Sequence, residues 1–119
     1  MRTEALREFK AGIFQALAHP TRVAIAEILR DGECSVGSIL ERLTLEQANI
    51  SQHLAVMRAK GVVTSRKEGN QVFYSLRHRM LVDVLDTMRL YFTKHLSEAS
   101  EMLQAVVVED NQLRKGETD

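Results

Sequence analysis

The stretch from Thr44 to Gly61, TLEQANISQHLAVMRAKG, constrains the fold of this chain more than any other. At about 3.6 residues per turn, Ile50, Leu54 and Met57 fall on one side of a helix. A helix that faces only water usually carries Glu and Lys on its outer side. Here the outer side is uncharged and consists of Ala48, Ser51, Gln52 and Ala55. Amides, hydroxyls and methyl groups can contact base edges in a major groove, so the stretch predicts a DNA-reading helix, with an ordinary surface helix as the alternative.

Three helices are predicted ahead of this stretch. Apolar residues recur at helical spacing over Thr3–Leu17, and Pro20 suits the first turn of a second helix that ends at Arg30. Ser35 can cap a short third helix that ends near Leu43. Because this third helix leads directly into the Thr44–Gly61 stretch, the pair is interpreted as a helix-turn-helix, although its turn lacks glycine.

A β-hairpin is predicted after Gly61. The runs Val62–Lys67 and Gln71–Leu76 are rich in β-branched and aromatic residues. The loop Glu68-Gly69-Asn70 separates them, and its Gly and Asn can adopt positive φ. Arg66 and other basic residues lie on or near the hairpin, as expected for a wing that contacts DNA. The alternative is a hairpin that only covers the core, with basic residues that keep its exposed strand edges from pairing with other chains.

A long helix is predicted from Arg79 to about Ala105, which at 1.5 Å per residue makes a rod of about 40 Å. Its apolar stripe exceeds what so small a core can cover, which indicates a second chain. We therefore expect a twofold dimer formed by the first and last helices. The expected interface residues are Leu6, Phe9, Ile13, Leu81, Leu85, Met88, Phe92 and His95. Residues 1–105 are expected to form one domain, and residues 106–119 a polar, mobile tail.

Charge is sorted along the chain although the 16 basic and 16 acidic residues cancel. The segment Thr44–Arg79 holds six Lys or Arg and two Glu, for +4, whereas Leu96–Asp119 holds six acids and two bases, for −4. A basic central segment and an acidic end favour binding of a phosphate backbone by one face of the protein, with the acidic end away from it. The zero net charge instead favours a module that binds protein and has no operator of its own.

Several classes of protein are disfavoured by the sequence. The chain has no apolar run of the roughly 18 residues that a membrane span needs, and its first residues lack the apolar core of a signal peptide, so no membrane partner and a cytoplasmic location are expected. The single cysteine, Cys34, cannot form an internal disulfide. No phosphate loop or catalytic spacing appears, so an enzyme is not expected.

Four ordered segments resemble the ArsR/SmtB family of bacterial winged-helix repressors: Leu17–Arg22 (LAHPTR), Ile50–Leu54 (ISQHL), Lys60–Val63 (KGVV) and Arg66–Leu76 (RKEGNQVFYSL). The resemblance implies a mainly α winged helix-turn-helix of about five helices plus a wing. It further implies a homodimer that binds double-stranded DNA at a palindromic promoter operator and is released by a small inducer. By the same resemblance the DNA-binding residues are Gln47, Asn49, Ser51, Gln52, His53, Arg58, Arg66, Lys67, Asn70 and Gln71.

The resemblance does not identify the inducer. Where some family members carry a pair of thiolates, this chain has Ser35 and Gly37, and soft metals need several sulfur ligands. Of a second family site, across the last helices, His95 and Glu98 are present, but Val82 and Val84 stand in place of the other two ligands. Neither a metal nor a cofactor is therefore expected, and His95 with Glu98 or a reactive Cys34 are the remaining sensing candidates.

Overall fold

The structure is a computed structural model that describes residues 2–117. The chain divides into two units between Val82 and Asp83, and each unit is described by itself. Among the described residues, no helix combines the length and the hydropathy that a membrane crossing requires. The elements in chain order are α1 (Thr3–Leu17), α2 (Pro20–Leu29), β1 (Cys34–Ser35), α3 (Val36–Leu43), α4 (Gln47–Ala59), β2 (Val63–Glu68), β3 (Gln71–Leu76) and α5 (Met80–Glu117).

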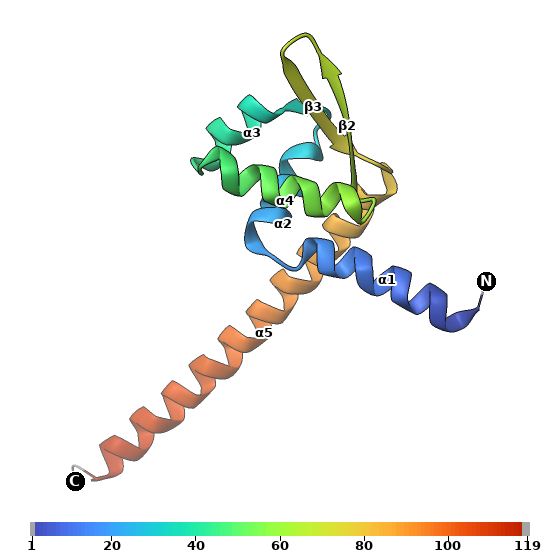
Figure 1. The fold of residues 1–119 in the computed structure, drawn as a ribbon. Helices are drawn as coiled ribbons and strands as arrows, with labels where there is room; N and C mark the ends of the chain where they lie inside the picture. Colours follow the sequence, from blue (N-terminus) through green and yellow to red (C-terminus); the bar gives the residue numbers. More distant parts are fainter. Residues whose placement is uncertain (1, 118–119) are drawn as a thin grey trace. The chain divides into compact units, whose positions relative to one another are not determined.

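The first unit packs α1 to α4 and a small sheet around one apolar core (Figure 1). Helix α4 lies against α2 and β2, while α3 lies against α2 and β3. Because every core position is apolar, the core is held by burial and close packing rather than by polar pairs. The core residues are Ala16, Leu17, Ile25, Ala26, Leu29, Ile39, Ile50, Leu54, Met57, Val62, Val63 and Leu76.

Local signals set the helix ends in this unit. Pro20 occupies the first turn of α2, and the His19 ring accepts a hydrogen bond at Nδ1 from the Thr21 N–H at 3.0 Å. The Ser35 hydroxyl accepts a hydrogen bond from the Ser38 N–H at 3.1 Å, which confirms the predicted cap of α3. Thr44 ends α3 at φ 49° and ψ 41°, so a threonine adopts the left-handed conformation that glycine usually supplies in such turns.

The predicted hairpin is confirmed as β2 and β3, which pair antiparallel from Val63↔Leu76 to Glu68↔Gln71. Gly69, at φ 59°, takes the first loop position, where a two-residue turn needs positive φ, whereas Asn70 does not have positive φ. The sheet has a third strand that the sequence did not predict: β1 pairs with β3, and the strand order is β1-β3-β2. The wing is therefore anchored at its base to the segment that starts α3.

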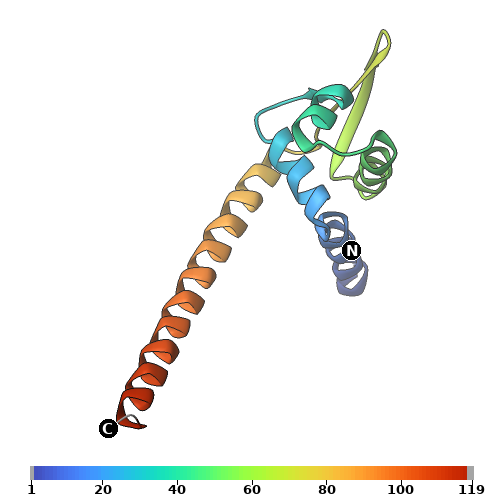
Figure 2. The same cartoon turned by 90° about the vertical axis from the view of Figure 1, so that its left-hand side faces the viewer.

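The second unit is the remainder of α5, a single continuous helix (Figure 2). The predicted end of this helix near Ala105 is wrong, because α5 continues to Glu117. Apolar residues continue beyond Ala105 with Val106 and the two valines after it. Asp110 forms an ion pair at 3.2 Å with Arg114, one turn further along the helix. No proline interrupts the segment, so nothing local stops the helix. The mobility of residues 106–117 stays a prediction, and Thr118 and Asp119 lie outside the described residues.

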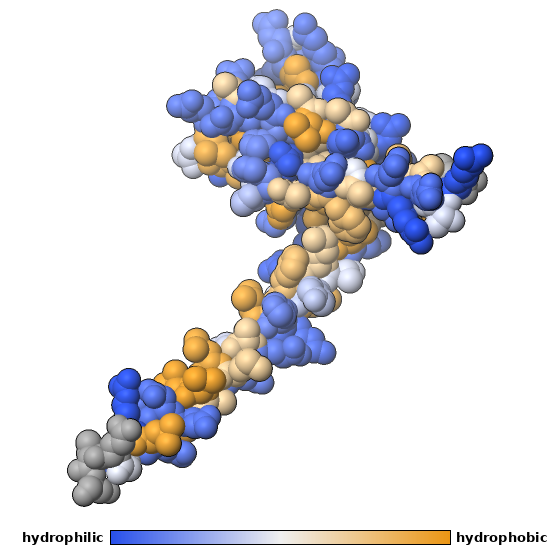
Figure 3. Space-filling view, turned by 60° about the horizontal axis from the view of Figure 1, so that its bottom comes forward, coloured by the Kyte–Doolittle hydropathy of each residue, from blue (hydrophilic) through white to orange (hydrophobic). Residues whose placement is uncertain are grey.

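Apolar side chains are exposed along much of α5, as the orange patches of Figure 3 show. Several of them are more than half exposed in the single chain. Isolated exposed apolar residues are ordinary, but a succession along one helix marks a surface that another molecule covers. The exposed large apolar residues beyond Asp83 are Val84, Leu90, Tyr91, Phe92, Leu96, Met102, Leu103, Val106, Val107, Val108 and Leu113.

Candidate nucleic-acid interface

Helix α4 has the two faces that its sequence predicts. Ile50 and Met57 are fully buried and Leu54 is 1% exposed, so one side of the helix is fixed against the core. The uncharged opposite side, formed by Ala48, Ser51, Gln52 and Ala55, is exposed to solvent. Because the buried side sets the rotation of the helix, the packing of the core determines which residues face outward.

Nine of the ten residues expected to contact DNA are exposed, and they come from α4 and the wing. Exposure of these side chains is what a DNA contact requires. On α4 the exposed residues are Gln47, Asn49, Ser51, Gln52 and Arg58. On the wing they are Arg66, Lys67, Asn70 and Gln71.

His53 differs from the other expected contacts because it is half-buried and contacts the α1–α2 junction. The Arg22 guanidinium donates a hydrogen bond from Nη1 to His53 Nδ1 at 3.2 Å, and the His19 and His53 rings are 4.3 Å apart between centroids. Burial, followed by the charges of His19 and Arg22, lowers the pKa of His53. The neutral ring with a free Nδ1 lone pair is therefore the form that fits this site.

Arg22 joins the end of α1 to α4. Besides its bond to His53, Arg22 donates from Nε to the Ala16 carbonyl at 2.8 Å and from Nη2 to the Gln15 carbonyl at 3.0 Å. These carbonyls lie at the carboxyl end of α1, where the Gln15 carbonyl also accepts a hydrogen bond from the Ala18 N–H at 3.1 Å. The sequence analysis assigned no role to Arg22, and its place directly after His19-Pro20-Thr21 was the only signal that singled it out.

Arg66 is held by residues of the same chain. Its Nε and Nη2 donate to the two carboxylate oxygens of Glu33 at 2.8 and 2.6 Å, and Nη1 donates to Glu68 at 2.6 Å. The guanidinium also lies 4.7 Å from the centroid of the Phe73 ring. Hydrogen bonds from Arg66 lower the pKa of Glu33, and those to Glu33 and Glu68 raise the pKa of Arg66.

The wing is thus tied at Arg66 to the residue before β1. Beyond this tie the exposed residues are Lys67, Glu68, Gln71 and the Gly69-Asn70 turn. Sequence reasoning missed Glu33 because it lies 33 residues from Arg66 and has no local pattern. The Glu33 carboxylate disfavours a phosphate contact by Arg66, because a phosphate would have to displace this bidentate carboxylate from the guanidinium.

The sensing candidates belong to different units of the chain, Cys34 to the first and His95 with Glu98 to the second. Cys34 is half-buried in β1 opposite Tyr74. His95 and Glu98 are exposed on α5, and the His95 ring lies parallel to the Tyr91 ring at 6.2 Å between centroids. Within residues 2–117, no group of three or more His, Cys, Asp or Glu side chains is arranged to hold a metal ion.

The residues expected at a dimer interface lie on α1 and α5, and in the single chain none of them is fully buried. Phe9 is 65% exposed and Phe92 is 50% exposed. Such exposure is unusual for phenylalanine on a surface that no other chain covers. Leu6 and His95 are also exposed, while those that are half-buried are Ile13, Leu81, Leu85 and Met88.

Comparison with known proteins identifies the family. The family model described as bacterial regulatory protein, arsR family, matches residues 19–65. The HTH-type transcriptional regulator Rv0081 of Mycobacterium tuberculosis is 37% identical over 105 residues, which cover 87% of this chain and 92% of the relative. The transcriptional activator HlyU of Vibrio cholerae is 40% identical over 80 residues, which cover 66% of this chain and 74% of the relative.

Solved structures agree with this relationship. The crystal structure of Rv0081 from M. tuberculosis has a TM-score of 0.72 and 38% identity, and the match covers 78% of this chain and 94% of that chain. The homodimeric winged helix-turn-helix DNA-binding domain of Mb0332 from Mycobacterium bovis has a TM-score of 0.75 and 25% identity over 82% of this chain and 90% of that chain. The protein therefore belongs to the ArsR family of bacterial transcriptional regulators and has its winged helix-turn-helix fold, as the sequence predicted.

Proposed function

We propose that this protein is a sequence-specific transcriptional repressor that acts as a homodimer on a palindromic operator and is released by a small inducer. The observation that carries the proposal is the exposed, uncharged side of α4, which begins with Gln47 and includes Ser51 and Gln52. A glutamine amide can pair with the N6 and N7 atoms of adenine, and a serine hydroxyl can bond to several bases.

The contacts divide into two kinds. We assign base reading to Gln47, Asn49, Ser51 and Gln52, because short neutral side chains on one exposed helix can approach base edges. We assign phosphate contacts to Arg58 and Lys67, with Asn70 and Gln71 at the wing turn beside the backbone or in the minor groove. His53 and Arg66 are assigned positioning roles, since both are engaged within the chain.

Dimerisation is proposed through the exposed apolar residues of α1 and α5. It is supported by the exposure of Phe9 and Phe92 and by the homodimeric state of the Mb0332 domain. A twofold pair would present two α4 helices about one DNA turn apart, roughly 34 Å, which suits a palindrome. In sedimentation velocity the proposal expects a mass twice the 13.5 kDa of the chain, and Phe92→Glu is expected to give monomers that lose operator binding.

Because promoter DNA is the proposed partner, the proposed place of action is the cytoplasm. The second candidate is a winged-helix module that binds protein and has no operator of its own, and the zero net charge favours it. The two candidates differ in one observable. Only the repressor shifts duplexes taken from upstream of its own gene at concentrations that leave random duplexes unbound.

The assignment of base readers is tested by comparing Gln52→Ala and Lys67→Ala on cognate and random duplexes over a range of salt. Loss of a good base pair contact costs about 1–3 kcal/mol, so Gln52→Ala should weaken cognate binding roughly 5- to 150-fold and leave random binding unchanged. Lys67→Ala should weaken both about equally and reduce the salt slope by about 1.

Matched controls are Gln104→Ala and Lys10→Ala, which remove the same groups from exposed positions on α5 and α1. Both controls should bind like the unaltered protein. Equal losses on cognate and random DNA for Gln52→Ala would show that Gln52 does not read bases. Failure of the unaltered dimer to prefer any upstream duplex would favour the protein-binding candidate.

A further inference from the structure

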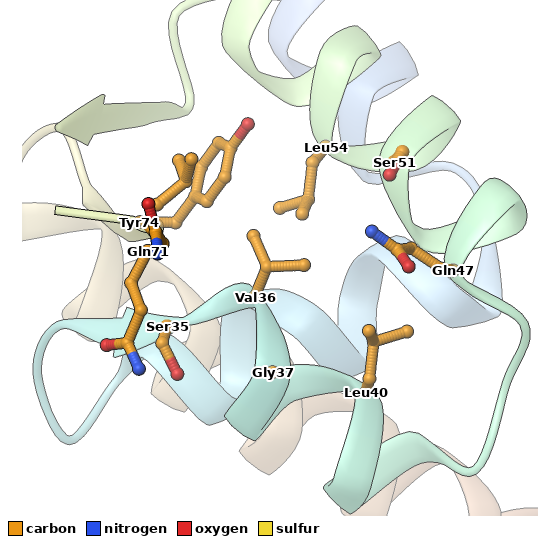
Figure 4. A pocket seen from close by; sticks show the side chains of 11 residues that line it. Ser35, Val36, Gly37, Leu40, Gln47, Ser51, Leu54, Gln71 and Tyr74 are labelled. Carbon is orange, nitrogen blue, oxygen red and sulfur yellow. The ribbon is translucent and has the colours of Figure 1, made fainter. Parts of the chain in front are cut away.

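A half-open groove of about 480 Å³ lies between α3, α4 and the wing, within the first unit (Figure 4). Its floor is apolar: Val36 and Leu54 point toward one another, with Leu40 beside them. Gln47 and Ser51 of α4 line one side, and Tyr74 of β3 lines the other. Its volume falls in the range of about 300–1,000 Å³ that small-molecule sites occupy.

No charged side chain lines the groove. A phosphate or carboxylate placed there would lose water without gaining an ionic partner, which is costly. The aliphatic floor and the Tyr74 ring suit a flat apolar body, while the Ser51 hydroxyl and the Gln47 amide can bond to a neutral polar group. These features fit an uncharged aromatic molecule.

The walls of the groove are held in place by structure outside it. Leu54 is 1% exposed, and the pairing of Ser35 with Phe73 joins the start of α3 to the wing. Gly37 is an exposed residue at the edge of the groove, and a Cβ at this position would fit, with the Ser35 hydroxyl at 3.9 Å as its nearest neighbour. The space is therefore largely formed before any ligand arrives, which lowers the cost of binding.

We infer that this groove binds an uncharged aromatic small molecule and that its occupation excludes DNA. The second half of the inference rests on the proposed function. Gln47 and Ser51 on α4, together with Asn70 and Gln71 at the wing turn, line the groove and are also proposed DNA contacts. A ligand held among these side chains occupies the space that the duplex needs, so ligand and DNA compete directly.

The site is tested with 2-naphthol as the probe, titrated into the ¹⁵N-labelled full-length protein while backbone amide shifts are recorded. Saturable shifts are expected at the groove residues Gly37, Ser51 and Val72. The anion 2-naphthoate, of nearly the same shape, should bind at least tenfold more weakly. Gly37→Leu, which adds a side chain at a residue that lines the groove, should weaken 2-naphthol at least tenfold, whereas the matched Gly116→Leu on α5 should not change it.

Three results would overturn the site: shifts that do not saturate, equal affinities for 2-naphthol and 2-naphthoate, or binding that Gly37→Leu leaves intact while its spectrum stays native. If Gly37→Leu does not fold, the same titration is made with Gly37→Val on α3 and with Ser51→Leu on α4, which both enlarge a residue that lines the groove. Shifts confined to the exposed apolar residues of α5 would place the probe elsewhere and also reject the groove.

Competition with DNA is measured separately by fluorescence anisotropy of a labelled operator duplex. At ten times its Kd, 2-naphthol should raise the apparent Kd for the duplex about elevenfold. At the same concentration 2-naphthoate, which binds at least tenfold more weakly, should raise it no more than about twofold. An unchanged Kd for DNA with the groove saturated would refute the exclusion. If the protein binds no duplex at all while the 2-naphthol shifts remain, the proposed function fails and the site stands.

Discussion

Replacing Arg22 with methionine removes the hydrogen bonds that join the end of α1 to α4 and keeps an unbranched side chain of similar reach. Three bonds are lost: to the Ala16 carbonyl at 2.8 Å, to the Gln15 carbonyl at 3.0 Å and to His53 Nδ1 at 3.2 Å. A hydrogen bond from a charged group contributes about 1.5–3 kcal/mol. Arg22 is only half-buried and the three bonds share one guanidinium, so we expect the free energy of unfolding to fall by about 2–4 kcal/mol rather than by their sum.

The measurement is urea unfolding followed by far-UV circular dichroism, at one fixed protein concentration because dimerisation changes apparent stability. Arg7→Met, on the exposed side of α1, is the matched control and should lie within about 0.5 kcal/mol of the unaltered protein. A loss for Arg22→Met no larger than that of Arg7→Met would refute the reasoning. In a double-mutant cycle with His53→Ala, strictly additive losses would show that the Arg22–His53 bond contributes nothing.

Three other substitutions test the first unit by the same unfolding measurement. Burial and the charges of His19 and Arg22 lower the pKa of His53, so the unfolded chain takes up a proton before the native state does, and stability should decline as pH falls below about 6.5. His53→Gln should flatten that decline, and an unchanged pH profile would contradict the assignment. Thr44→Gly should stabilise by about 0.5–1 kcal/mol, because glycine adopts the positive φ without the steric cost that threonine bears; a loss of stability would count against strain at this turn. Leu54→Ala should cost about 2–5 kcal/mol through loss of buried contacts, against less than about 1 kcal/mol for the exposed Val56→Ala on the same helix, and similar costs for the two would argue against the packing of α4 described above.

The elements with strong local signals were predicted from the sequence. Helix α1 and strand β3 have the predicted bounds, and α2 begins at the predicted Pro20. The cap at Ser35 and the turn at Gly69 also lie where the sequence indicated. These features depend on residues close together in the chain, which is why single-sequence reasoning finds them.

The features that were missed depend on contacts between distant residues. Strand β1 is two residues long and is defined by its pairing with β3, so it is too short to show a periodic pattern in the sequence. Arg22, which bonds to His53, and Glu33, which bonds to Arg66, lie 31 and 33 residues away from them, and no local pattern indicates either partner. The length of α5 was underestimated for a different reason: a polar composition was interpreted as the absence of a helix, although nothing in the segment before Gly116 opposes one.

The tie between Arg66 and Glu33 anchors the base of the wing, and beyond it the two strands stay paired as far as Glu68 and Gln71. Any remodelling of the hairpin beyond Glu68 and Gln71 therefore leaves the anchored part and the core untouched. Inserting two residues into each strand at the tip would lengthen the hairpin by about 7 Å and keep every side chain on its present face, because faces alternate with a period of two. Such an insertion would move the wing turn outward and leave the residues of α4 and their packing unchanged.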